Sequence, residues 1–205
     1  MKKKLYQVKT IEEAMSLAIK DFGLSETEIT FTVISEKRGF LGLGRRIDVE
    51  AVVNVDGVEK GKTYLQTILD NGNIQGFIEK KVRGNHVAFN VEAGDHNGYL
   101  IGRNARTLNS LQLLTSIVIN NYYSTDNAKT VLVDVGDYKK RREHNLERMA
   151  TQYAKQVIKT KQKIQLDKLN AYERKIIHKK LSTWKEIKTY SVGDEPNRQI
   201  VIEIK

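Results

Sequence analysis

An arginine and a histidine stand four residues apart near the C-terminus, at Arg174 and His178. Residues at this spacing share one face of a helix, so a helix here would present a guanidinium and an imidazole side by side. Such a pair suits phosphate oxygens, because a guanidinium stays charged and donates parallel hydrogen bonds. Lys175 and Lys179 lie next to them in the sequence, and we expect all four side chains to point outward. The pattern predicts a phosphate-binding helix face.

His178 also has a structural interpretation, because a lone histidine on a helix is often a hydrogen-bonding residue of the fold. It would then hold its arginine neighbour or the following turn in place. That turn, Gly193–Arg198, contains the only proline of the chain. Arg198 is a further candidate for binding phosphate, and Asp194 and Glu195 are candidates for orienting Arg198.

A second candidate site is a short turn that we expect between two helices. Its glycine lets another backbone approach the peptide chain closely. The helix after the turn directs N–H groups toward a phosphate, and two arginines add charge. The candidate residues are Ile101, Gly102, Arg103, Asn104, Ala105 and Arg106.

A third candidate is the glycine-rich run at residues 37–46, with three glycines in six residues and cations on both sides. Backbone N–H groups of such a run can wrap an anion, but the spacing fits neither a Walker motif nor a Rossmann fingerprint. Its apolar residues Phe40 and Leu41 suit contact with a protein better. We interpret it as a glycine hairpin with a structural or partner-binding role, with candidates Arg38, Gly39, Phe40, Leu41 and Gly42.

The positive charge is concentrated in one part of the chain. Residues 137–205 contain 18 Lys and Arg against 9 Asp and Glu, and so carry +9 of the formal net charge of +10. Such concentration is typical of proteins that bind nucleic acid or an anionic membrane surface. A solvated, lysine-rich helix face is the other interpretation.

Several classes of protein and site do not fit the composition. The absence of cysteine excludes disulfides and thiolate metal sites and suits a reducing cytosol. The longest nearly uncharged stretch, 107–128, contains Asn, Ser, Thr and Gln throughout, so we expect a soluble chain without direct membrane insertion. The four histidines form no metal motif, and no nucleophile or carboxylate pair has an acid–base context. We expect no enzyme, no catalytic residue, no metal and no cofactor.

Hydrophobic periodicity predicts an α+β chain of three small domains, at 1–55, 61–136 and 137–205. The first reads as strand, helix, strand, turn and strand, with Thr10, followed three residues later by Glu13, as the candidate cap of the helix. A connector at 54–60 leads to the second, which reads as helix, strand, strand, helix, turn, helix and strand. The ranges expected there are a helix at 63–69, strands at 74–82 and 86–91, a helix at 108–122 and a strand at 130–135.

The third domain is expected to hold two helices and two strands. The first helix runs to about Lys163 and buries a stripe of seven residues: Leu146, Met149, Ala150, Tyr153, Ala154, Val157 and Ile158. The second opens at Asn170 with a capping-box pattern that ends in Glu173. The strands are expected at 186–190 and 199–204.

Residues 63–135 resemble a type II K-homology domain, whose signature is an Ile-Gly-x-x-Gly turn between two helices. Ile101-Gly102-Arg103-Asn104 carries the resemblance, with Ala105 in place of the second glycine. If that position needs a left-handed backbone, the methyl group of Ala105 weakens the binding of a nucleic acid by this turn.

The segment 172–178, with Thr189-Tyr190-Ser191 and Gly193–Arg198, resembles an Arg-x-x-x-His single-stranded nucleic-acid-binding domain. The loop Arg38–Gly44 resembles the Lys-Gly-Phe loop of the Jag N-terminal domain. In this order the three units resemble the bacterial Jag family, also called KhpB, across essentially the whole chain.

This resemblance implies a cytoplasmic, non-catalytic protein that binds single-stranded RNA, or single-stranded DNA, and acts as an RNA chaperone. It implies a smaller K-homology partner protein and links to cell elongation, cell-wall homeostasis and a membrane insertase or cell-division partner. A homodimer is also open, because the apolar helix 108–122 can pack across a two-fold axis. In the alternative function, the N-terminal glycine-rich loop docks a membrane-associated protein, and RNA binding is secondary.

Overall fold

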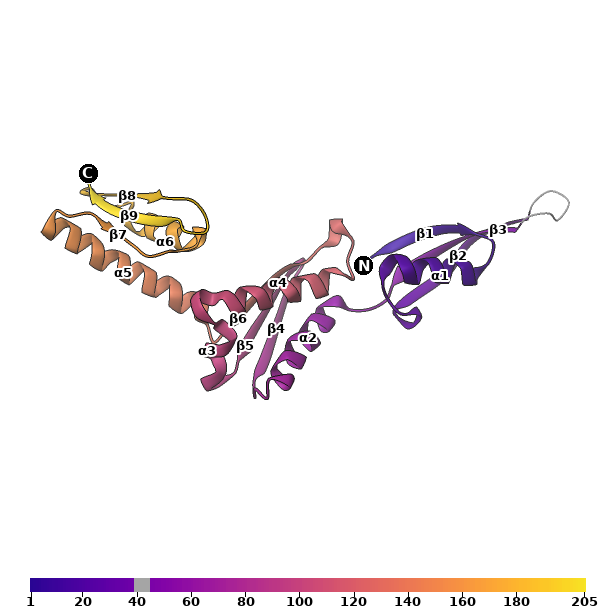
Figure 1. Cartoon of the computed structure of the whole chain (residues 1–205). Coiled ribbons are helices and arrows are strands. Elements are labelled where there is room, and N and C mark those ends of the chain that lie inside the picture. The colour runs from indigo at the N-terminus through magenta and orange to yellow at the C-terminus, as the bar shows by residue number, and fades with distance from the viewer. Residues whose placement is uncertain (39–44) are drawn as a thin grey trace. The chain divides into compact units, whose positions relative to one another are not determined.

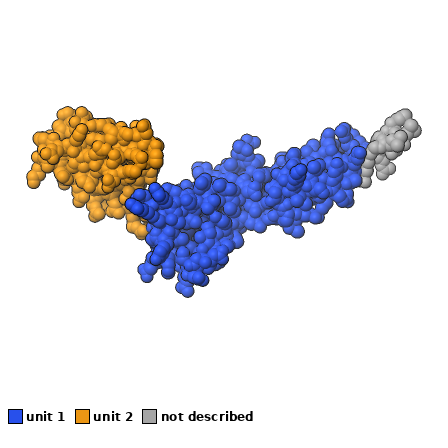
Figure 2. Space-filling model, viewed as in Figure 1, with its two compact units in different colours: residues 1–136 blue, residues 137–205 orange. Residues whose placement is uncertain are grey.

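The computed structural model describes residues 1–38 and 45–205 (Figure 1). Within these ranges the chain is α+β, as predicted, with helices α1–α6 and three sheets of three strands. It forms two compact units, Met1–Gly136 and Asp137–Lys205 (Figure 2). Short 3₁₀ turns cover Glu26–Glu28 (η1), Gly94–His96 (η3), Arg103–Ala105 (η4) and Thr125–Asn127 (η5).

The first sheet lies at the N-terminus of unit 1 and has the order β1-β3-β2, antiparallel throughout. Alternate residues of β3 turn toward α1, which covers one face of the sheet (Figure 1). The hydroxyl of Thr10 caps α1 as predicted, accepting from the backbone N–H of Glu13 at 3.2 Å. The elements are β1 (Lys3–Val8), α1 (Ile11–Phe22), β2 (Ile29–Arg38) and β3 (Arg45–Val53).

The predicted partner-binding loop falls largely outside this description. Gly39, Phe40, Leu41 and Gly42 are not among the described residues. Arg38 is the last residue of β2, where its backbone pairs with that of Arg45. The role of this loop stays a prediction.

The second sheet of unit 1 has the order β4-β5-β6, with β5 antiparallel to β4 and parallel to β6. A parallel pair needs a crossover, and α3 and α4 supply it between β5 and β6. The order of elements is the predicted one. The elements are α2 (Gly57–Asn71), β4 (Phe77–Arg83), β5 (His86–Glu92), α3 (Asn97–Ile101), α4 (Arg106–Asn120) and β6 (Thr130–Val135).

The predicted connector at 54–60 was wrong in its second half, because α2 begins at Gly57. The carboxylate of Asp56 caps this helix, accepting from the N–H of Val58 at 2.8 Å. A Cβ atom on Gly57 or Gly61 would overlap α4 at Ile119. These glycines, which usually weaken a helix, allow α2 and α4 to approach closely.

Unit 2 packs α5 and α6 against an antiparallel sheet of order β7-β9-β8. All seven residues of the predicted α5 stripe belong to the hydrophobic core or pack against it. Asn170 and Glu173 form the predicted capping box of α6. The elements are α5 (Tyr138–Thr160), β7 (Ile164–Gln165), α6 (Ala171–Leu181), β8 (Ile187–Val192) and β9 (Gln199–Ile204).

Candidate nucleic-acid interface

The turn between α3 and α4 is built around Gly102. Its backbone has φ 68° and ψ 175°, a region that is essentially restricted to glycine. A Cβ atom there would overlap the hydroxyl of Thr107. The backbone at Gly102 is therefore not covered by a side chain of its own. A side chain at this position would disrupt the first turn of α4.

Two residues after Gly102 also adopt the left-handed backbone conformation. Asn104 has φ 53° and Ala105 has φ 57°. Asparagine tolerates this conformation better than alanine, for which it costs about 1 kcal/mol. Ala105 does adopt a left-handed backbone, so the absence of the second glycine of the signature strains this turn.

The charged groups of this turn are available to a ligand. Arg103 and Arg106 are exposed, and neither has an ion-pair partner within the described ranges. Ala105, at the N-cap of α4, supplies no side-chain acceptor to the first N–H groups of this helix of 15 residues. The N–H of Arg106 itself donates to the backbone oxygen of Arg103, so the positive end of the helix and the two guanidinium groups are what favour an anion here.

In unit 2 the structure places Arg174 differently from the prediction. Its side chain is only 7% exposed and points inward, so the predicted outward orientation was wrong. It lies on the face of α6 that also carries the core residues Ile177 and Leu181, three and seven positions later. Two hydrogen bonds compensate the buried charge of Arg174.

Two acceptors hold the guanidinium of Arg174. Nη1 donates to the backbone oxygen of Leu169 at 2.7 Å, and Nη2 donates to Oε1 of Glu195 at 2.5 Å. Glu195 was predicted to orient Arg198, but its partner is Arg174. The ion pair therefore fastens the turn between β8 and β9 to α6.

His178 has the geometry of a structural residue. Its Nδ1 lies 2.6 Å from the hydroxyl of Thr189 in β8. Burial lowers the pKa of the imidazole, and the nearby charge of Arg174 lowers it further. The ring is thus kept neutral near pH 7 and joins α6 to β8.

The remaining predicted residues of unit 2 do point outward. Lys175 and Lys179 are exposed on α6, and Arg198 is exposed in the turn before β9. In the part of the chain that the structure describes, none of the three has an ion-pair partner. By contrast, Arg142 at the start of α5 is paired with Glu173 at 2.8 Å. Lys180 of α6 is likewise paired with Glu147 at 3.1 Å, so the available lysines of this helix are Lys175 and Lys179.

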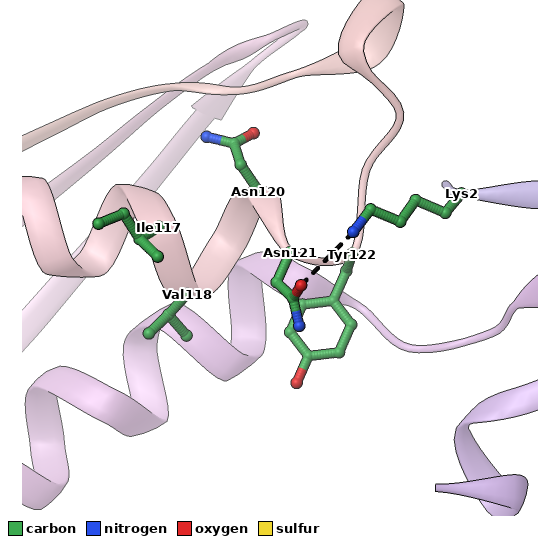
Figure 3. A pocket seen from close by; sticks show the side chains of 6 residues that line it. All are labelled: Lys2, Ile117, Val118, Asn120, Asn121 and Tyr122. Atoms are coloured by element: carbon green, nitrogen blue, oxygen red, sulfur yellow. Dashed lines mark hydrogen bonds between the residues drawn. The ribbon is translucent and has the colours of Figure 1, made fainter. Parts of the chain in front are cut away.

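One surface depression of unit 1 lies away from the turn at Gly102. This depression, at the end of α4 opposite the turn, is lined by Lys2, Ile117, Val118, Asn120, Asn121 and Tyr122 (Figure 3). It holds one ammonium group, which donates to Asn121 at 3.4 Å, and otherwise apolar and amide groups. Among the described residues, no cluster of three His, Asp or Glu side chains is arranged to hold a metal ion, and no helix is long and apolar enough to cross a membrane.

Comparison with known proteins agrees with two of the three predicted domain types. The Jag N-terminus family model matches residues 6–55, and the family model of the Arg-x-x-x-His domain matches residues 144–203. The second match contains Arg174, His178 and the turn that carries Arg198.

Similar proteins cover nearly the whole chain. RNA-binding protein KhpB of Bacillus subtilis is 35% identical over 202 residues, which are 96% of each chain. RNA-binding protein KhpB of Clostridium symbiosum is 32% identical over 200 residues, 96% of this chain and 89% of that protein. The Lactiplantibacillus plantarum protein of the same name is 37% identical over 142 residues, 69% of this chain and 43% of that protein. Since the first two identities extend over almost the full length of both chains, the protein belongs to the KhpB family.

Proposed function

We propose that this chain is a non-catalytic, single-stranded RNA-binding protein. The main support is the pair of exposed cation sets, one beside the glycine turn of unit 1 and one on α6 of unit 2, that have no partner within the described residues. The relatives are named RNA-binding proteins, and none of the three names describes an enzyme or an adaptor. These names favour RNA binding over the docking of a membrane-associated protein as the primary function.

In unit 1, the segment from about residue 61 to 136 acts as a type II K-homology domain. The bare backbone of Gly102 lets the RNA backbone approach the turn. The N–H groups that follow Arg106 in the first turn of α4, with the side chains of Arg103 and Arg106, bind the phosphates. Such a turn holds about four nucleotides.

In unit 2, the residues that touch phosphate are Lys175, Lys179 and Arg198. Arg174 and His178 support these residues without touching RNA. Arg174 fastens the turn that carries Arg198, and His178 joins β8 to α6. This arrangement contacts the RNA backbone, which is the same for every sequence, so unit 2 contributes affinity rather than base selection.

Two modest binding surfaces on one chain raise the apparent affinity, because the second contact becomes intramolecular. Weak, sequence-tolerant contacts suit an RNA chaperone that works in the cytoplasm. Residues 1–55 act as a separate partner-binding domain. A smaller K-homology partner, a membrane insertase and a role in cell elongation and wall homeostasis remain part of this proposal through the family resemblance.

The experiment is fluorescence anisotropy of labelled single-stranded RNA with the full chain at several salt concentrations. Each of the double variants Arg103→Ala/Arg106→Ala and Lys175→Ala/Lys179→Ala is expected to bind more weakly. The slope of log K against log salt should become shallower by about 1.4, because each single-strand phosphate contact contributes about 0.7.

The matched control is Lys9→Ala/Lys20→Ala, which removes the same charge from exposed positions of the first domain. It should leave the slope unchanged. Absence of binding by the wild-type chain even at low salt would refute RNA binding and return the adaptor function to first place.

A further inference from the structure

Two tyrosines are exposed without a role in the fold. The side chains of Tyr99 and Tyr172 are 76% and 63% exposed. Other tyrosines are held by acidic partners, as Tyr6 is by Asp21 and Tyr190 is by Glu203. Within the described ranges, no hydrogen bond holds the hydroxyl of Tyr99 or Tyr172.

Each of these tyrosines precedes the exposed cations of its unit by a similar spacing. Tyr99 lies in α3, four and seven residues before Arg103 and Arg106. Tyr172 lies in the first turn of α6, three and seven residues before Lys175 and Lys179. On α6 this spacing places all three side chains on one face.

We propose that Tyr99 and Tyr172 are base-stacking residues, each of which receives a nucleobase of single-stranded RNA beside the phosphates held by its neighbouring cations. The proposal rests on the proposed function and adds to it. Single-stranded nucleic acid is commonly bound by this combination, a cationic track for the backbone and an aromatic face for the bases. Since every base has a π face, the contact adds affinity without demanding a sequence.

The surroundings of Tyr99 favour a base over a phosphate. Its ring centroid lies 6.1 Å from that of His96, tilted by 32°, so two aromatic rings stand together at the surface. A Cβ atom on Gly98 would meet no atom within 4 Å, so the surface beside Tyr99 is open.

The surroundings of Tyr172 favour the same ligand. Arg174 is turned inward onto Glu195, and its guanidinium is therefore unavailable to a base. Glu173 is occupied by Arg142 and by the cap of α6. The outward side of the helix thus presents one aromatic ring and two ammonium groups.

Phe77 provides a matched control. It is a similarly exposed ring, at 68%, in the same unit as Tyr99. It begins β4, directly opposite Glu92 in the strand register and two residues from Glu79. The next cation along this face of the strand, Lys81, is paired with Glu79 at 3.0 Å, so this exposed ring has no free neighbouring cation on its strand face and predicts no binding.

The test measures the affinity of the full chain for a short, labelled uridylate oligomer and for the same oligomer with abasic positions. Tyr99→Ala and Tyr172→Ala should each weaken binding of the uridylate oligomer by about tenfold, the size of one stacking contact. The salt slope should not change, because no phosphate contact is lost. Tyr99→Phe, Tyr172→Phe and Phe77→Ala should bind like the wild type.

Abasic positions should weaken wild-type binding and have less effect on each alanine variant. Circular dichroism and the fluorescence of Trp184 check that the variants are folded. Unchanged affinity in a folded alanine variant overturns the assignment of that tyrosine, and equal wild-type affinity for both oligomers overturns the proposal while RNA binding itself stands. If the wild type binds neither oligomer, the proposed function fails as well.

Discussion

The turn at Gly102 and the helix face at Arg174 were both predicted to contact a phosphate-bearing ligand, but the structure uses them differently. At the turn, the arginines are exposed and the backbone is held in an unfavourable conformation. On α6, the arginine of the motif is buried and donates to two acceptors within unit 2. One site presents its charged groups, and the other uses its charge to position the groups beside it.

The difference shows that a charged residue in a motif can act through the chain instead of through the ligand. Burying a guanidinium is unfavourable unless an acid and a hydrogen bond compensate it. Arg174 has both, from Glu195 and Leu169. Its proposed contribution to RNA binding is therefore the position of Arg198.

Among the stability changes we expect, the greatest is at Glu195. Replacing Arg198, in the same turn, should change stability little. Glu195→Ala leaves the buried guanidinium of Arg174 with a single acceptor and should destabilise unit 2 by about 2–3 kcal/mol, the lower part of the range for a buried pair because Glu195 itself is 58% exposed. Arg198→Ala removes an exposed cation and should leave stability within about 0.5 kcal/mol while weakening RNA binding. Trp184, the only tryptophan of the chain, packs against the core of unit 2, so its fluorescence reports unfolding of this unit in urea.

Equal stability of Glu195→Ala and the wild type would show that the pair does not fasten the turn. Glu195→Asp serves as a further control, since it keeps the charge with a shorter reach. Its free energy of unfolding should lie between those of the wild type and the alanine variant.

The next effect concerns the backbone of the other site. Gly102→Ala introduces a Cβ atom into a glycine-only conformation against Thr107 and should destabilise unit 1 by about 2 kcal/mol. Ala105→Gly should instead stabilise it by about 1 kcal/mol, because glycine adopts the left-handed conformation without strain. Hydrogen exchange of the amides in the first turn of α4 measures both changes. Slower exchange in Gly102→Ala, or faster exchange in Ala105→Gly, would contradict the strain at this turn.

The smallest effect concerns pH. Burial and Arg174 lower the pKa of His178 in the folded chain below its ordinary value of 6.5, so the unfolded chain binds this proton more readily. The contribution of His178 to stability is therefore complete above pH about 6.5 and is lost as the pH falls below it. Urea unfolding followed at Trp184 should show this loss in the wild type and less of it in His178→Gln. The same pH dependence in both proteins would contradict a half-buried, neutral His178.

Local sequence signals predicted much of this fold. The element order of residues 57–136, the buried stripe of α5 and the caps at Thr10 and Asn170 follow from spacing and side-chain chemistry within a few residues of one another. The start of α2 could not be predicted in this way. It depends on the fit of Gly57 and Gly61 against α4, which lies far away in the sequence.

In the candidate site, too, local features were predictable and features that depend on distant residues were not. The sequence indicated the exposed cations correctly, but the burial of Arg174 depends on Glu195, which lies 21 residues further along the chain and in another element. Tyr99 and Tyr172 were not singled out, because only the structure shows which aromatic side chains the core leaves exposed. Their spacing from the following cations was the available signal.

We propose that RNA touches the exposed groups of both sites and leaves the Arg174–Glu195 pair of unit 2 intact. The decisive measurement is a titration of the isotope-labelled full chain with single-stranded RNA, followed by amide and guanidinium NMR signals. Shifts are expected at Gly102–Thr107, on the outward face of α6 and at Arg198, while the Nε–H signal of Arg174 changes little. A large shift or loss of the Arg174 signal, with the turn at Gly102 unaffected, would refute this mode of binding.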